Sequence, residues 1–134
     1  MYKKIRIESI ISNIRIVENA IDTAIGEIGI SGECYGKILV STLEAVNNAI
    51  LHGNRSDPSK KVSIIISYDE EILKIMVSDE GPGFRPEEVP DPTFPENREA
   101  LNGRGVFLMM KLADKIKYSK KGNMVTMTFK NIKA

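Results

Sequence analysis

The sequence predicts an α+β fold, a two-layer α/β sandwich in which three helices cover one face of a mostly antiparallel sheet of about five strands. Two observations predict this fold class. First, the spacing of apolar residues switches between a period of about 3.6 residues, typical of helices, and a period of about two, typical of strands. Second, most strand segments follow one another with short turns between them, so neighbouring strands are antiparallel and the helices are left to share one face.

Size and composition limit the possible functions. The chain has 134 residues, 42% hydrophobic and 28% charged, and we expect one domain over residues 1–134. No apolar run approaches the ~20 residues of a membrane span, and the N-terminus lacks a signal-peptide pattern, so we expect a cytoplasmic protein without a membrane partner. The formal net charge of +1 argues against nucleic acid as a main partner, and the single cysteine, Cys34, excludes a disulfide framework.

The N-terminal half begins with a strand and continues with two helices. Residues 3–7 alternate polar and apolar side chains, which predicts a short strand at an edge of the sheet. Apolar residues then keep helical spacing over 13–28, with Ser12 or Asn13 placed to cap the start. A second helix is predicted over about 33–52.

The second helix carries polar side chains that suggest chemistry. Four of them gather opposite the apolar stripe: Ser41, Glu44, Asn48 and His52. Glu44 and Asn48 are one helical turn apart, so a carboxylate that can polarise a hydroxyl lies beside an amide oxygen that can ligate a hard cation such as Mg²⁺. A solvated face on an amphipathic helix explains the same pattern, and the helix alone does not decide between the two.

A hairpin followed by a carboxylate is predicted in the middle of the chain. Residues 62–68 and 72–78 have strand character on either side of a short acidic turn. The period of two places Asp79 on the apolar side where the second strand ends, and a carboxylate there needs hydrogen-bond donors. Gly81 and Gly83 follow and allow a flat ligand to approach the backbone. An ordinary Asp-Gly turn is the alternative.

A long loop and a glycine-rich helix start come next. Residues 85–102 contain four prolines and little periodicity, which is typical of a mobile lid over a site. Gly103, Arg104 and Gly105 then open a helix predicted to run to Ala113, and the free backbone N–H groups of a helix start suit phosphate. A flexible hinge at the start of the helix is the alternative.

The C-terminal segment predicts a second hairpin. Residues 116–118 and 125–129 have strand spacing, and Gly122 and Asn123 lie in the turn between them. With this hairpin the sheet reaches about five strands.

The order of these motifs resembles a known nucleotide-binding fold. Glu-x-x-x-Asn on a helix, Asp-x-Gly-x-Gly after a strand, a long loop and Gly-x-Gly at a helix start resemble the ATP-binding domain of gyrases, heat-shock chaperones, mismatch-repair ATPases and histidine kinases. Segments 44–53 and 103–110 look more closely like the anti-sigma-factor serine/threonine kinases of bacterial sporulation and stress responses. The resemblance covers almost the whole chain.

The resemblance implies roles for the residues that would contact adenine and the metal ion. Asn48 would coordinate Mg²⁺ that bridges the phosphates of ATP, and Asp79 would accept a hydrogen bond from the adenine amino group. Glu44 would be the catalytic base. Gly81 and Gly83 would line the adenine pocket.

The resemblance also implies how the phosphates are enclosed. Gly103, Arg104 and Gly105 would lie beside them, under an ATP lid of about residues 84–102. Asn123 stands where many relatives carry a threonine beside the adenine, and its amide can still donate a hydrogen bond.

The implied function is a cytoplasmic, homodimeric protein serine/threonine kinase that uses ATP and Mg²⁺ to phosphorylate an anti-sigma-factor antagonist and holds a sigma factor inactive. Two alternatives stay open. A nucleotide-gated binding module would hold a partner without phosphorylating it. A detached histidine-kinase catalytic domain is disfavoured because no dimerising helix pair with an acceptor histidine precedes the nucleotide site. His52, the sole histidine, is better explained as a hydrogen-bonding residue at a helix end.

Overall fold

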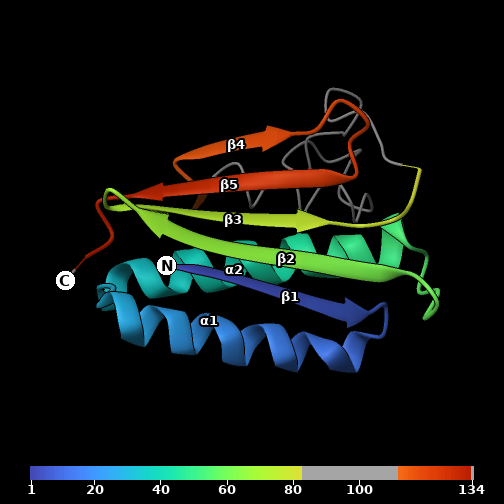
Figure 1. Ribbon diagram of the computed structural model, residues 1–134, viewed down its shortest axis with the longest axis horizontal. Helices are drawn as coiled ribbons and strands as arrows, with labels where there is room; N and C mark the ends of the chain where they lie inside the picture. The colour runs from blue at the N-terminus through green and yellow to red at the C-terminus, as the bar shows by residue number, and fades with distance from the viewer. Residues whose placement is uncertain (83–111, 134) are drawn as a thin grey trace, which may run out of the picture.

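The computed structural model describes residues 1–82 and 112–133, which form a sheet layer and a helix layer. The strands are β1 (Tyr2–Glu8), β2 (Lys61–Asp69), β3 (Ile72–Ser78), β4 (Lys115–Tyr118) and β5 (Met124–Lys130). They form one antiparallel sheet in the order β1-β2-β3-β5-β4 (Figure 1). The predicted two-layer α+β fold is confirmed, and so is the edge position of the first strand.

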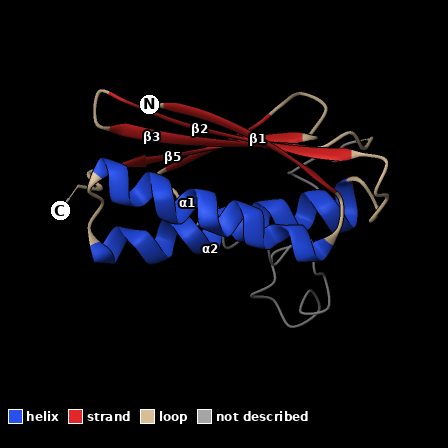
Figure 2. Ribbon diagram, turned by 60° about the horizontal axis from the view of Figure 1, so that its bottom comes forward, coloured by secondary structure: helices blue, strands red, loops and turns tan. Residues whose placement is uncertain are grey.

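Two α-helices of the described residues, α1 (Ile14–Ile28) and α2 (Gly32–Asn48), lie side by side on one face of the sheet (Figure 2). Gly29 ends α1 in the left-handed conformation, with φ of 80°. Asn13 occupies the N-cap position of α1, as predicted, but its side chain makes no cap bond. A 3₁₀ turn precedes the helix, and the Asn13 amide donates to the Glu8 carbonyl oxygen at 3.2 Å. The third predicted helix, ending at Ala113, falls almost entirely outside the described residues.

The last turn of the second predicted helix differs from expectation. The α-helix stops at Asn48, and a π-helical turn, η2 (Ala49–Gly53), replaces the regular helix predicted to continue to His52. The N–H of Asn54 closes this turn on the carbonyl oxygen of Ala49 at 2.8 Å. A π turn holds one more residue per hydrogen-bonded ring than an α turn, so it redirects the backbone that follows.

The core lies between the helices and the inner face of the sheet. The helices contribute fully buried side chains at Val17, Ile21, Ile38, Val46 and Ile50, and the strands at Ile64, Ile66, Leu73, Ile75, Met127 and Phe129. Burial of each such side chain stabilises the fold by roughly 1.5–3 kcal/mol. This core fixes the strand ends from which the loops at the end of the sheet begin. Ser41 was wrongly assigned to the solvated face of its helix, since it is fully buried and its hydroxyl donates to the Lys37 carbonyl oxygen at 2.6 Å.

The strand order places three chain segments at one end of the molecule. Because β5 pairs with β3, the turn that precedes β5 comes beside the exit of β3, and the end of α2 lies at the same end of the molecule (Figure 1). No helix within residues 1–82 and 112–133 is long and apolar enough to cross a membrane.

Candidate functional site

The π turn η2, which follows α2, and the exit of β3 meet at Asp79. The backbone of Gly53 approaches the Asp79 carboxylate so closely that a Cβ atom on residue 53 would overlap the carboxylate group. A Cβ atom on Gly81 would overlap the carbonyl oxygen of Gly53. Both positions therefore require glycine, and two motifs that are distant in the sequence form one site.

Backbone groups hold Asp79 in place. Its own N–H donates to the Asn123 carbonyl oxygen at 2.9 Å, and the Gly81 N–H donates to its carboxylate Oδ1 at 2.8 Å. The Asn123 amide donates to the Asp79 carbonyl oxygen at 3.4 Å. Within the described part of the chain, the second carboxylate oxygen, Oδ2, makes no hydrogen bond.

Burial has the largest effect on the charge of this carboxyl group. Partial desolvation raises the pKa of Asp79, while the Gly81 N–H and nearby lysine charges act in the opposite direction. A partly buried carboxylate gains more from a further hydrogen-bond donor than an exposed one does.

Glu44 and Asn48 lie one turn apart on α2, and both side chains are partly exposed. Neither side chain takes part in the hydrogen bonds and ion pairs among the described residues. Residues 1–82 and 112–133 hold no cluster of three or more His, Cys, Asp or Glu side chains suited to a metal ion. A cation held by Asn48 would therefore need its other ligands from phosphate and water, which is the usual coordination of Mg²⁺.

A model of the histidine kinase-like ATPase domain matches residues 9–129 of this chain. The chain belongs to this family. Among individual proteins, the serine-protein kinase RsbW of Oceanobacillus iheyensis is 28% identical in an alignment of 111 positions that covers 78% of this chain and 70% of the relative. The anti-sigma F factor of Geobacillus stearothermophilus is 36% identical in an alignment of 75 positions that covers 54% of this chain and 51% of the relative, about half of its length.

The fold is also shared with a solved structure. The chain is similar to the crystal structure of the RsbU and RsbW domains of a Mycobacterium tuberculosis protein, with a TM-score of 0.66 and 18% identity. The similarity covers 97% of this chain and 32% of that one. The resemblance predicted from the order of motifs is confirmed, including its closer form, because relatives named as anti-sigma factors match.

The structure does not describe the remaining predicted site residues. Gly83, Gly103, Arg104 and Gly105 lie outside the described residues, as does the lid predicted over 84–102. Their roles stay predictions.

Sequence reasoning missed two residues of the candidate site. Gly53 was part of the helix motif, but nothing in the helical spacing pointed to its contact with Asp79. Asn54, next to it, is only 1% exposed, and its side chain bonds to three other segments of the chain. An asparagine directly after a glycine at a helix end is typical of a local cap. The local pattern therefore gave no signal of long-range bonds.

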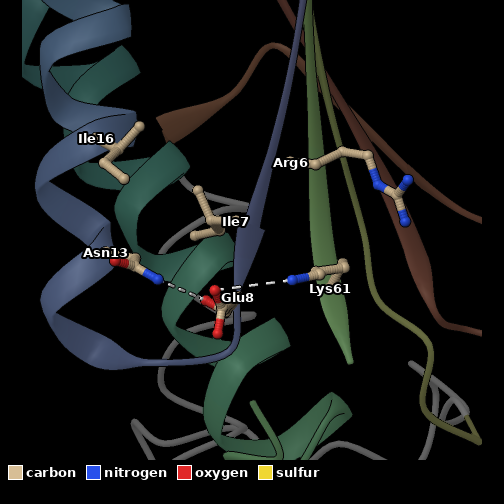
Figure 3. Close-up of a pocket in the computed structure, with 6 residues that line it drawn as sticks. All are labelled: Arg6, Ile7, Glu8, Asn13, Ile16 and Lys61. Atoms are coloured by element: carbon tan, nitrogen blue, oxygen red, sulfur yellow. Dashed lines mark hydrogen bonds and ion pairs between the residues drawn. The ribbon is translucent and has the colours of Figure 1, made fainter. Parts of the chain in front are cut away.

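A pocket of about 300 Å³ lies elsewhere, on the outside of the ATPase domain where β1 leads into α1 (Figure 3). Its lining residues are Arg6, Ile7, Glu8, Asn13, Ile16 and Lys61. Glu8 ties its walls together, because its carbonyl oxygen accepts from Asn13 and its carboxylate lies 3.9 Å from the Lys61 ammonium. No predicted site residue lines this pocket, so it is separate from the candidate site.

Proposed function

We propose that this chain is a protein serine/threonine kinase of the anti-sigma-factor type, which binds ATP at Asp79 and α2 and phosphorylates an antagonist protein. The observation that carries the proposal is the contact of Gly53 and Gly81 with the Asp79 carboxylate. That contact brings the end of the segment that carries Glu44, the predicted catalytic base, and Asn48, the predicted metal ligand, to Asp79. Asp79 is the residue predicted to bind adenine. The names of the relatives suggest the kinase class.

Adenine recognition is assigned to the exit of β3. The Oδ2 of Asp79 would accept a hydrogen bond from the adenine amino group. Gly81, which has no side chain to clash with the Gly53 carbonyl oxygen, would line the pocket beside it. Gly83 and Asn123 are proposed to complete this pocket.

Phosphate chemistry is assigned to α2. Asn48 would hold Mg²⁺ through its amide oxygen, and the bound ion supplies positive charge that offsets the phosphate charge. Glu44 would accept the proton of the attacking serine or threonine hydroxyl as that oxygen bonds to the γ-phosphorus and ADP leaves. Gly103, Arg104 and Gly105 would surround the phosphates beneath the lid of residues 84–102.

The proposed partners follow from the same assignment. They are an anti-sigma-factor antagonist as phosphoacceptor, a sigma factor that is held inactive, and a second copy of the chain. We place this assembly in the cytoplasm. Light scattering after size exclusion tests the homodimer independently of the kinase activity.

Transfer from labelled ATP to candidate antagonists tests the activity. We expect Glu44→Gln to retain ATP binding but to slow transfer by ~100-fold or more, the typical loss when a positioned base is removed. Asn48→Ala should abolish Mg²⁺-dependent ATP binding. Glu33→Gln, at the exposed start of the same helix, is the matched control and should transfer at the wild-type rate.

The outcomes separate the alternatives. Equal transfer rates in wild type and Glu44→Gln would contradict the assignment of the base. Tight ATP-dependent partner binding by a wild type that transfers nothing would favour a nucleotide-gated binding module. An acid-labile phosphorylated product would favour histidine chemistry, because phosphoserine survives acid and phosphohistidine does not.

A further inference from the structure

The side chain of Asn54 uses all of its ordinary hydrogen-bonding groups in the protein interior. Its amide Nδ2 donates to the Ser9 hydroxyl at 2.8 Å and to the Lys61 carbonyl oxygen at 3.0 Å, while its Oδ1 accepts from the Glu80 N–H at 2.8 Å. A buried amide with every group satisfied holds one orientation, because any rotation would leave a polar atom unpaired.

The donor side of Asn54 is anchored to the frame of the fold. Ser9, which follows β1, is 1% exposed, and its hydroxyl donates to the Lys60 carbonyl oxygen at 2.7 Å. Lys61 is the first residue of β2. Asn54 is therefore fixed to the ends of two paired strands as well as to the π turn.

The acceptor side of Asn54 reaches the turn that carries Asp79. Three successive N–H groups in this turn have fixed partners: Asp79 bonds to the Asn123 carbonyl oxygen, Glu80 to Asn54, and Gly81 to the Asp79 carboxylate. The first bond ties the turn to the start of β5, and the third lies within the turn. Within the described residues, the bond from Glu80 to Asn54 is thus the hydrogen bond that joins this turn to the end of η2, the π turn that continues α2.

We propose that Asn54 is a positioning residue that determines base selectivity by fixing Asp79 relative to α2. The inference rests on the proposed ATP site and adds to it a determinant of specificity. Guanine carries a carbonyl oxygen where adenine carries an amino group, and it carries an N–H donor at the neighbouring ring position. A carboxylate that can shift could accept from guanine, whereas a fixed carboxylate faces the carbonyl oxygen and rejects it. Asn54 supplies that fixed position without touching the nucleotide.

Binding affinities for ATP and GTP, measured with Mg²⁺ well below the melting temperature, test the inference. Asn54→Ala should lower the ratio of ATP to GTP affinity by about tenfold or more, since misplacing a hydrogen bond to a charged group has effects of this size. Asn54→Ser is the second variant if Asn54→Ala does not fold, because the shorter hydroxyl cannot bridge partners on both sides. It should lower the same ratio.

Ser9→Ala is the matched control. It removes a hydroxyl from the same buried network but leaves the bonds of Asn54 to Glu80 and Lys61 in place. We expect Ser9→Ala to lose stability and to keep the wild-type ATP-to-GTP ratio, which separates positioning from a general structural role.

The results can overturn the inference and the proposed function separately. An ATP-to-GTP ratio that is the same in wild type and the Asn54 variants overturns the role of Asn54 and leaves the ATP site intact. A folded wild type that binds neither nucleotide overturns the proposed ATP site and the inference with it.

Discussion

Asp79 combines a stability cost with a proposed binding role. Burial raises the pKa of its carboxyl group above the ordinary value of 3.8. The folded state then binds the proton more tightly than the unfolded chain does, so the ionised carboxylate destabilises the ligand-free protein at neutral pH. This cost shrinks as the pH falls through the raised pKa of the folded state, and it is gone below the ordinary value, where both the folded and the unfolded chain hold the proton.

We predict that Asp79→Asn stabilises the ligand-free protein at neutral pH and lowers ATP affinity by about tenfold or more. The gain in stability should shrink as the pH falls through the raised pKa of the folded wild type, because its carboxyl group then takes up the proton. Chemical denaturation at several pH values and ATP titration measure the two effects.

Asp57→Asn is the control with the opposite sign. Hydrogen bonds from Ser59 lower the pKa of Asp57, so this carboxylate stabilises the fold at neutral pH and the contribution is lost as the pH falls through its lowered pKa. Asp57→Asn should therefore lower stability at neutral pH and leave ATP affinity unchanged. A gain of stability in both variants would contradict the role given to burial at Asp79.

At the level of the elements, the hairpin of β2 and β3 contains a turn whose sequence does not suit its backbone. Glu70 and Glu71 both have positive φ angles, 51° and 63°, as a two-residue type I′ turn requires. Residues with a Cβ atom are disfavoured there, and asparagine followed by glycine is the preferred pair.

We predict that Glu70→Asn combined with Glu71→Gly raises the free energy of unfolding by roughly 1 kcal/mol, because the strain in the turn is relieved. Urea denaturation measures this gain. The double variant Glu70→Gln with Glu71→Gln removes the same charges but keeps the strain. If it gives an equal gain, charge repulsion and not backbone conformation limits the stability of the turn.

The elements themselves were largely predictable from the sequence. The strands over 62–68 and 72–78 match β2 and β3 closely, since a period of two is imposed by one buried face. The end of α2 was not predictable in the same way. The spacing of apolar residues indicates which face of a helix is buried. It does not show that the regular helix changes to a π-helical turn at η2.

For the whole molecule, the site is an assembly of the helix layer and the sheet layer. A nucleotide that contacts Asn48 on α2 and Asp79 beyond β3 would join the two layers, so its binding should protect both segments together from hydrogen exchange. A ligand that binds only the folded state at about 100 times its Kd stabilises the protein by ~2.7 kcal/mol.

We therefore predict that ATP with Mg²⁺ raises the melting temperature of the wild type and slows exchange at the end of α2 and at the exit of β3 together. Differential scanning fluorimetry and hydrogen exchange measure these effects. Asn48→Ala is the control and should lose both. Protection confined to one of the two segments would contradict a site shared between the layers.

The sequence alone determined the fold class, the five strands, the two helices of the described residues, and the choice of Glu44, Asn48 and Asp79 as candidates, because each depends on local spacing and residue chemistry. Only the tertiary structure decided that Gly53 lies against Asp79 and that Asn54 bonds to the turn that carries Asp79. The physical reason is that such contacts depend on how the helix layer packs on the sheet and on the placement of β5 beside β3. Residue spacing within one segment carries no record of that arrangement.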